Sequence, residues 1–197
     1  MKEQWDNRYA SDQYIYGYQP NEFLSSQLSK IKPGKILLPG DGEGRNAVFA
    51  AKLGWKTFAF DYSVTAKEKA LSLATKEKVN IHYFNSDVEE FETIEKFDVI
   101  AVIYFHLPEK TRLSFHKKLK QFLKPNGMVI LECFSKNQLQ NNSGGPKNLD
   151  LLYSLEDISH DFSDYKIEYL SELKVELNEG ILHQGLAEVI RLIARNN

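Results

Sequence analysis

The sequence predicts an α/β fold built on a mostly parallel, seven-stranded sheet that ends in an antiparallel hairpin. Seven apolar runs alternate, over most of the chain, with segments whose apolar residues recur at helical spacing. The first run leads directly into a glycine-rich loop, as the first strand of many parallel sheets does. The last two runs are joined by the turn sequence Asn178-Glu179-Gly180, which favours a hairpin over another crossover.

Three predicted strands lie in the first half of the chain, and each ends in a loop of small or polar residues. They cover residues 35–38, 55–60 and 80–84. Two alanine-containing helices separate them, one over residues 46–53 and one that begins at Ser63.

The second half of the chain begins with its most apolar segment, residues 98–105, as expected for a central parallel strand covered on both faces. A helix over 108–123 and a strand over 128–132 follow, and the turn sequence Pro125-Asn126-Gly127 separates them. The remaining predicted elements are a polar loop over 137–148, a short helix over 155–162, and hairpin strands over 165–177 and 185–194.

Composition limits the class of protein. Hydrophobic residues make up 42% of the 197 residues, which is enough for a core, so we expect one domain over residues 1–197 with residues 1–30 as an amino-terminal cap. The formal net charge of −2 argues against the basic surface that binds nucleic acid. The lone Cys133 has no internal disulfide partner, and no Cys/His spacing resembles a zinc site, so no metal is expected.

The amino terminus is charged and lacks the apolar core of a signal peptide. No run approaches the roughly 20 apolar residues that cross a bilayer. A cytoplasmic protein without a membrane partner is therefore expected.

The glycine loop carries the functional argument. Gly40, Gly42 and Gly44 alternate with acidic residues, so the backbone can turn sharply and approach a ligand without a Cβ in the way. The helix that follows presents unpaired N–H groups and a partial positive charge, which suit a carboxylate or a phosphate.

Two acidic residues end the next two predicted strands. Asp61 lies where an acid accepts hydrogen bonds from ribose hydroxyls in dinucleotide-binding folds, and Asp87 lies where a carboxylate can accept from an adenine amine beside the Val88 N–H. Each has a plainer interpretation, since Asp61 can cap the next helix and Asp87 can close a turn. All three features fall at the carboxyl ends of strands, where open α/β sheets bind ligands.

These motifs carry a family resemblance. The run Leu38 to Asn46, Leu-Pro-Gly-Asp-Gly-Glu-Gly-Arg-Asn, resembles the first motif of class I S-adenosylmethionine (SAM)-dependent methyltransferases. That run and the opening Trp5-Asp6-Asn7-Arg8-Tyr9 are similar to the branch that includes the tellurite-resistance and thiopurine-type enzymes. The resemblance spans essentially the whole chain and implies a Rossmann-like methyltransferase fold, SAM as cofactor and S-adenosylhomocysteine (SAH) as product.

One position departs from the family pattern. The motif usually has an acidic residue two positions before its first glycine, and Leu38 stands there. Asp41, Glu43 or backbone carbonyls are the alternatives for contacting the methionine amino group. The residues that the loop and the resemblance together place at the cofactor are Arg8, Tyr9, Gly40, Asp41, Gly42, Gly44, Arg45, Asn46, Asp61, Tyr62, Ser63, Asp87, Val88 and Tyr104.

His106 is the candidate for acid–base catalysis, because it follows the central strand and histidine titrates near neutral pH. Its alternative role is a hydrogen bond to a loop carbonyl. His183 is a weaker candidate, and Glu132 either lines the acceptor pocket or caps its strand. Arg8 pairs either with the cofactor carboxylate or with Asp6 or Asp12.

Aromatic residues are expected to form the rim of the site, where they either pack the cap or contact the sulfonium by cation–π interactions. They are Trp5, Tyr9, Tyr14, Tyr16, Tyr18, Tyr104, Phe105 and Phe134.

The segment Tyr104-Phe105-His106-Leu107-Pro108 lacks the Asn/Asp-Pro-Pro-aromatic signature of enzymes that methylate base amines. A small-molecule acceptor is therefore expected, such as a soft sulfur, selenium or tellurium nucleophile, a thiol or an amine. The alternatives are an NAD-binding oxidoreductase, although the spacing here is Gly-x-Gly-x-Gly rather than Gly-x-Gly-x-x-Gly, and a SAM-binding module without catalysis.

Overall fold

A computed structural model describes residues 2–197, with side chains from Trp5 onward. It contains one seven-stranded sheet in the order β3-β2-β1-β4-β5-β7-β6, in which β7 runs in the direction opposite to the other six strands. The predicted α/β fold with its carboxyl-terminal antiparallel hairpin is confirmed. The strands are β1 (Lys35–Pro39), β2 (Lys56–Asp61), β3 (His82–Asn85), β4 (Phe97–Ile103), β5 (Leu123–Phe134), β6 (Lys166–Glu179) and β7 (His183–Arg195).

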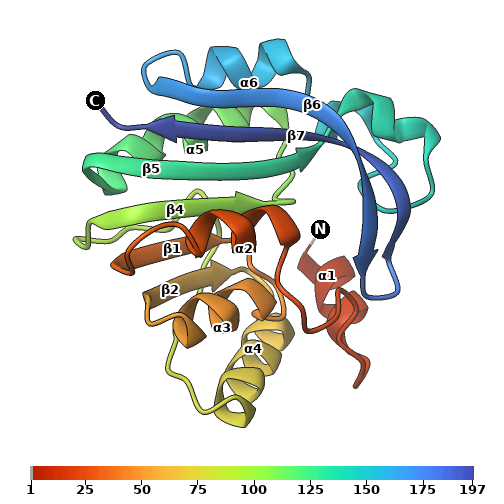
Figure 1. The fold of residues 1–197 in the computed structure, drawn as a ribbon. Coiled ribbons are helices and arrows are strands. Elements are labelled where there is room, and N and C mark those ends of the chain that lie inside the picture. Colours follow the sequence, from red (N-terminus) through yellow and green to blue (C-terminus); the bar gives the residue numbers. More distant parts are fainter. Residues whose placement is uncertain (1) are drawn as a thin grey trace.

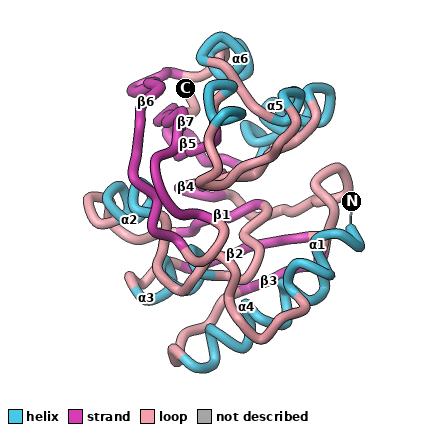
Figure 2. The backbone as a smooth tube through the Cα atoms, turned by 90° about the vertical axis from the view of Figure 1, so that its right-hand side faces the viewer, coloured by secondary structure: helices cyan, strands magenta, loops and turns pink. Residues whose placement is uncertain are grey.

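Helices cover both faces of the sheet, with α2 and α3 on one side and α5 and α6 on the other (Figure 1, Figure 2). The alternation of side chains along β1 explains the two layers, because Ile36 and Leu38 pack on the α2–α3 side and Leu37 packs on the α5–α6 side. The helices are α1 (Lys2–Tyr9), α2 (Glu22–Leu28), α3 (Arg45–Lys52), α4 (Val64–Lys76), α5 (Glu109–Phe122) and α6 (Leu155–Asp161), with 3₁₀ turns at Lys136–Gln140 and Leu149–Leu151.

The central strand ends earlier than predicted. We expected it to run to residue 105, but β4 stops at Ile103 and Tyr104 adopts a positive φ of 51°. This left-handed conformation turns the chain away from the sheet, so Phe105 and His106 belong to the loop at the carboxyl edge. Near the start of β5, Leu123 pairs with Phe97 and Met128 pairs with Val99, so residues 124–127 bulge out at the predicted turn.

The hairpin is longer than predicted and curves past the carboxyl ends of the parallel strands (Figure 1). Its tip reaches the amino-terminal segment, where the Ile181 N–H donates to the Ile15 carbonyl over 2.9 Å. Gly17 and Gly180 lie so close that a Cβ on Gly17 would stand 3.1 Å from the Gly180 nitrogen. The segment expected to be a cap thus meets the hairpin above the edge where the glycine loop lies.

The amino-terminal segment contains two helices that the sequence analysis did not predict. In α2, Asn21 accepts a hydrogen bond from the Leu24 N–H, and Phe23, Leu24 and Leu28 are buried against the sheet. The turn between α1 and α2 is held by Lys69 of α4, whose ammonium group donates to the carbonyls of Ser11 and Gln13.

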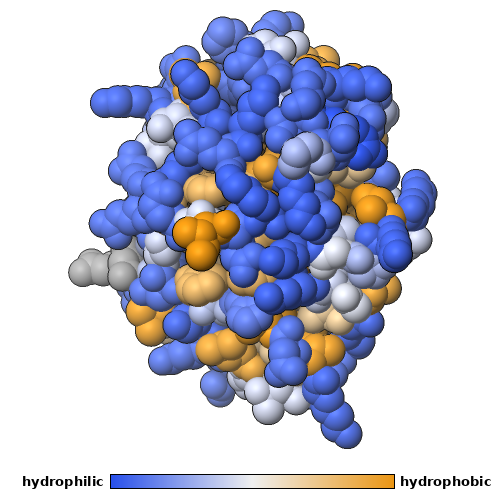
Figure 3. All heavy atoms as spheres, turned by 90° about the vertical axis from the view of Figure 1, so that its left-hand side faces the viewer, coloured by the Kyte–Doolittle hydropathy of each residue, from blue (hydrophilic) through white to orange (hydrophobic). Residues whose placement is uncertain are grey.

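The face at the amino ends of the strands, seen in Figure 3, is mainly hydrophilic with scattered apolar side chains. Within residues 2–197, no helix has the length and apolar character needed for a bilayer crossing.

Candidate functional site

The loop between β1 and α3 is built for close approach to a ligand. Gly40, Gly42 and Gly44 have φ angles of 60°, 56° and 85°, a region that residues with a Cβ rarely adopt. Gly44 also lets two helices meet, because a Cβ there would stand 2.5 Å from the Ala70 Cβ on α4. The loop therefore depends on glycine for its backbone conformation and for its packing.

Asp61 lies directly under this loop at the end of β2. One carboxylate oxygen accepts from the Gly42 N–H at 3.1 Å, and the other accepts from the Ser63 N–H at 2.9 Å. Burial raises its pKa to about 6, and the two backbone N–H groups oppose that shift. The loop and the acidic strand end are thus in direct contact, as a nucleoside site of this kind requires.

Asp41 lies within the loop. Its Oδ2 accepts from the Ala47 N–H in the first turn of α3 at 3.1 Å. Burial raises its pKa to about 7, while the Ala47 N–H and the charge of Arg45 act in the opposite direction. A cationic group beside Asp41 would favour the carboxylate.

Two aromatic side chains cover the loop in this conformation. A Cβ on Gly42 would stand 2.7 Å from the Tyr9 hydroxyl, and one on Gly40 would stand 2.3 Å from the Phe105 ring. The glycine cradle and the acids fit the amino-acid and ribose parts of SAM. Tyr9 and Phe105 pack directly against the loop.

The other residues predicted near the purine and ribose lie at the ends of β2 and β3. Ser63 caps α4 by accepting from the Ala66 N–H, and its hydroxyl donates to Asp6 of α1. Tyr62 is half-buried. Asp87 is exposed and accepts from the Glu89 N–H in a turn, whereas Val88 is buried in the apolar layer. Asp87 therefore closes a turn, which was the alternative to contacting an adenine amine.

Three residues predicted at the cofactor contact other parts of the protein. Arg8 donates to the Tyr16 hydroxyl at 3.1 Å and stacks on Trp5, so it pairs with neither Asp6 nor Asp12. Arg45 and Asn46 join the cap and the hairpin to the start of α3, as the following contacts show.

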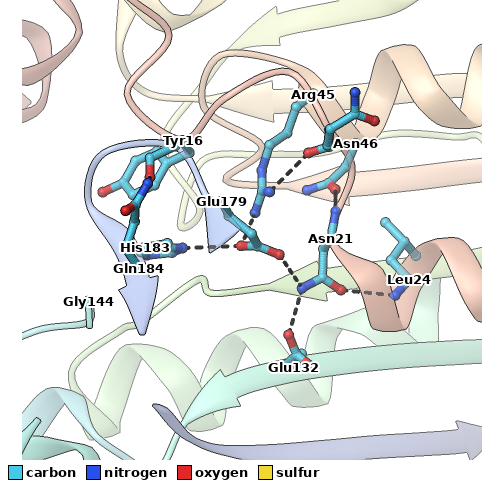
Figure 4. A network of polar contacts seen from close by, with 12 residues as sticks. Tyr16, Asn21, Leu24, Arg45, Asn46, Glu132, Gly144, Glu179, His183 and Gln184 are labelled. Carbon is cyan, nitrogen blue, oxygen red and sulfur yellow. Dashed lines mark hydrogen bonds and ion pairs between the residues drawn. The ribbon is translucent and has the colours of Figure 1, made fainter. Parts of the chain in front are cut away.

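A buried polar network lies beside the glycine loop (Figure 4). Arg45 donates to Glu179 of the hairpin at 2.7 Å and to the Gln19 carbonyl at 3.1 Å. Asn46 accepts from the Asn21 N–H, and the Asn21 amide donates to Glu132 at 2.6 Å and to Glu179 at 3.2 Å. The network ties β5, β6, α3 and the cap together.

His106 makes the hydrogen bond to a loop carbonyl that was the alternative to acid–base catalysis. Its Nδ1 lies 2.6 Å from the Leu151 carbonyl, and its Nε2 accepts from the Phe134 N–H at 3.2 Å. Burial lowers its pKa to about 4. Both ring nitrogens are engaged, so in this conformation His106 fastens the loop after β4 to the end of β5 and has no nitrogen left for a substrate.

His183 differs from His106 in that a carboxylate holds only one of its two ring nitrogens. Its Nδ1 lies 3.3 Å from Glu179, and among the described residues Nε2 makes no hydrogen bond. Its ring stands edge-on to Tyr104 and Phe134, which stack on each other with centroids 4.5 Å apart. Burial lowers the pKa of His183, and Glu179 partly offsets this.

Glu179 and Asn21 were missed as site residues from sequence. Glu179 lies within the turn signal of the hairpin, and only the fold brings it to Arg45 and His183. Burial alone would raise the pKa of Glu179, but the hydrogen bond from His183 and the charge of Arg45 lower it to about 2. Glu132, which pairs with Arg191 and Asn21, belongs to the same network.

Comparison with known sequences gives a methyltransferase signature. Residues 36–127 match the family profile described as "Methyltransferase domain". The chain is 26% identical over 163 residues to a ubiquinone biosynthesis O-methyltransferase of Rickettsia conorii, an alignment that covers 80% of this chain and 55% of that protein. The chain thus spans about half the length of the curated relatives that it matches.

Solved structures share the fold. A protein from a study titled "Conversion of a Disulfide Bond into a Thioacetal Group during Echinomycin Biosynthesis" aligns with a TM-score of 0.80 at 16% identity, covering 99% of this chain and 91% of its own. TehB from Haemophilus influenzae aligns with a TM-score of 0.74 at 17% identity, and the alignment covers 100% of this chain and 67% of TehB. The N-methyltransferase NodS from Bradyrhizobium japonicum, in complex with SAH, aligns with a TM-score of 0.71 at 16% identity. This alignment covers 99% of this chain and 97% of NodS.

Proposed function

We propose that this protein, whose residues 36–127 match a methyltransferase domain profile, is a SAM-dependent methyltransferase that acts on a small-molecule acceptor. The observation that carries the proposal is the contact between the loop and the strand end, in which the Asp61 carboxylate accepts from the Gly42 N–H. That contact presents a carboxylate for ribose hydroxyls next to a backbone cradle at the carboxyl edge of the sheet.

The sulfonium of SAM supplies an activated methyl group, so the protein has mainly to align the reactants and exclude water. In the proposed complex, Asp61 accepts from the ribose hydroxyls, and the loop from Gly40 to Gly44 holds the amino-acid part. We expect Tyr9 and Phe105, which pack against the loop, to form the rim that shields the site from solvent.

The acceptor side of the site contains a histidine–carboxylate pair. Glu179 fixes Nδ1 of His183, so Nε2 can accept a proton from a hydroxyl or thiol acceptor as that group attacks. The stacked rings of Tyr104 and Phe134 form the adjoining apolar wall. This pair favours an acceptor that must lose a proton.

A soft sulfur, selenium or tellurium nucleophile is the second candidate acceptor. The resemblance of the loop sequence to the tellurite-resistance branch favours it. A nucleophile of this class that carries no proton on the attacking atom, such as a thioether or a tellurium oxyanion, needs no base, so the effect of replacing His183 separates it from a hydroxyl or thiol acceptor.

Binding calorimetry with SAM, SAH and NAD tests the proposed function. We expect micromolar binding of SAM and SAH and none of NAD. Asp61→Ala should weaken SAH by about 1–3 kcal/mol, since the carboxylate no longer accepts from the ribose. Binding of NAD without SAM would instead support the oxidoreductase alternative.

Methyl transfer from labelled SAM to a panel of phenols, thiols, amines and tellurite then identifies the acceptor. SAM binding without transfer to any member would favour a binding module over an enzyme.

A further inference from the structure

We propose that the loop over residues 141–146 forms a wall of the acceptor site that limits the size of the acceptor, and that Gln138 is the positioning residue that holds this wall against His183. The inference rests on the proposed function and deepens it on the acceptor side. The loop contains the run Gly144-Gly145-Pro146 and lies between β5 and β6.

Two glycines place the backbone of the 141–146 loop directly on the rings of the acceptor side. A Cβ on Gly144 would stand 2.6 Å from Cδ2 of His183 and 3.2 Å from its Nε2. A Cβ on Gly145 would stand 2.8 Å from the Phe134 ring. Figure 4 shows Gly144 next to His183. The loop therefore lies beside the ring nitrogen that is proposed to accept the proton, and a side chain at Gly144 would cover that nitrogen.

The side chain of Gln138 fastens this loop. It is 1% exposed and uses both the donors and the acceptor of its amide. Nε2 donates to the Ser143 hydroxyl and to the Gly144 carbonyl, each over 3.0 Å. Oε1 accepts from the Asn141 amide at 3.1 Å and from the Glu188 N–H of β7 at 2.8 Å. One buried side chain thus joins the loop to β7.

Ser143 adds a second tie to the same strand. Its side chain is buried, and the hydroxyl donates to the Leu186 carbonyl at 2.6 Å. His183 is the first residue of β7, so the wall and the proposed base share one support. Because buried polar groups lose free energy when their partners are removed, these hydrogen bonds keep the loop at a fixed distance from Nε2.

A wall fixed in this way selects acceptors by size. An acceptor that gives its proton to Nε2 of His183 must bring its hydroxyl or thiol within about 3 Å of that atom. The backbone of Gly144 lies at the same nitrogen. A bulky acceptor therefore meets the loop, whereas a small acceptor does not.

The test uses variants that release the loop without adding a charge. Gln138→Met has a similar length and removes every hydrogen bond of the amide. Gln140→Met is the matched control, because Gln140 is exposed and its side chain makes no hydrogen bond among the described residues. Ser143→Ala removes the second tie and serves if Gln138→Met is unstable, and Ser143→Thr, which keeps the hydroxyl, should behave like the unaltered protein.

The first measurement needs no acceptor. Diethyl pyrocarbonate modifies accessible neutral histidines, and peptide mass spectrometry follows each of them. We expect Gln138→Met and Ser143→Ala to raise the rate at His183 by about tenfold or more relative to the exposed His160. The two control variants should leave this ratio within about twofold.

His116 shows whether a variant has unfolded, because it is buried and bonded to Asp161 on the other side of the sheet. It should stay unreactive in every variant. A rate at His183 that does not change in Gln138→Met would show that the loop is not held over the base, and the inference would be wrong.

The second measurement is methyl transfer from SAM to thiophenol and to the larger 2-naphthalenethiol. We expect Gln138→Met to lower the preference for thiophenol, measured as the ratio of the two kcat/KM values, by about tenfold. The change should lie mainly in KM for the larger thiol, and SAH affinity should stay within about twofold. A general loss of structure would not shift the ratio in this direction.

An unchanged ratio in a variant whose His183 has become reactive would overturn the size selection while leaving the proposed function intact. If the unaltered protein methylates neither thiol, the proposed function fails for thiols and the acceptor role of the wall fails with it. The reactivity of His183 then still shows whether Gln138 holds the loop.

Discussion

Arg45, the first residue of α3, donates a 2.7 Å hydrogen bond to Glu179, the last residue of β6. Both side chains are almost completely buried, with 7% and 10% of their surfaces exposed. The helix that follows the glycine loop is therefore fixed to the tip of the carboxyl-terminal hairpin. The pair thus joins the hairpin to the helix that begins directly after the loop that we propose binds the cofactor.

Removing one partner of this pair should be strongly destabilising. Glu179→Gln leaves the Arg45 charge buried without compensation, and we expect a loss of about 3–5 kcal/mol in the free energy of unfolding. Urea denaturation measures it. The exposed pair Lys52–Glu77 provides the control, and Glu77→Gln should change the stability far less. Equal effects of the two substitutions would contradict the structural role of the buried pair.

Gly44→Ala should disrupt the loop through two effects. The φ of 85° is strained for alanine, and the new Cβ would stand 2.5 Å from the Ala70 Cβ. We expect a loss of about 3 kcal/mol or more in unfolding free energy. Gly54→Ala is the matched control, because Gly54 has a φ of 90° but no atom nearer than 4.0 Å to the new Cβ. Its loss should be limited to the backbone cost of about 1–2 kcal/mol.

His106 should make the fold sensitive to acid. Its pKa is about 4 in the folded protein and 6.5 in the unfolded chain, so protonation favours unfolding. Its contribution is present above pH 6.5 and is lost as pH falls towards 4, by about 3 kcal/mol in total. His106→Asn, which keeps a donor for the Leu151 carbonyl, should remove this dependence.

The measurement for His106 is the difference in unfolding free energy between the protein and the variant at several pH values. The difference is needed because Asp41 and Asp61 make the unfolding free energy rise as pH falls, whereas His106 makes it fall. Their pKa values are raised on folding, so they favour the fold as pH falls through about 7 and 6. A difference that does not change between pH 7 and 4 would show that His106 is not buried in its neutral form.

His183→Gln should lower kcat for a hydroxyl or thiol acceptor by about 10²- to 10⁴-fold, since the proton acceptor is lost. We expect SAH affinity to stay within a few-fold, because in the proposed complex His183 faces the acceptor and not the cofactor. The pKa of His183 is lowered from 6.5, so the ring is neutral at pH 7 and the rate should fall only below pH 6.5. His160, exposed on α6, is the control. An unchanged kcat with a soft nucleophile as acceptor would favour the second candidate class.

The succession of strands and helices along the chain, and the position of the loop, could be predicted from local patterns in the sequence. The Gly-x-Gly-x-Gly run could be assigned to the start of α3, and Asp61 to the end of β2, because strand ends and helix starts have short-range signals. The predicted end of the central strand was wrong, because Tyr104 and Phe105 are residue types that favour strands and so continue the pattern of β4. The left-handed turn at Tyr104 has no local sequence signal.

The buried network was beyond the reach of sequence patterns. Asn21 and Glu179 are 158 residues apart and meet only because the hairpin curves past the strand ends. For the same reason Arg45, which follows the glycines, contacts Glu179. A separate long-range contact places His106 against Leu151 of the second 3₁₀ turn. Sequence position indicated which residues approach the site, and long-range packing decides which of their atoms remain available to a ligand.

The contact between the hairpin tip and the amino-terminal segment has a consequence for biosynthesis. The Ile181 N–H donates to the Ile15 carbonyl, and β7 lies between β5 and β6 in the sheet. A chain emerging from the ribosome can form the parallel strands long before β7 is made, but the hydrogen bond between Ile181 and Ile15 cannot form until the hairpin exists. The contacts that join the cap and the start of α3 to the hairpin, Ile15–Ile181 and Arg45–Glu179, therefore form only after the hairpin has been translated.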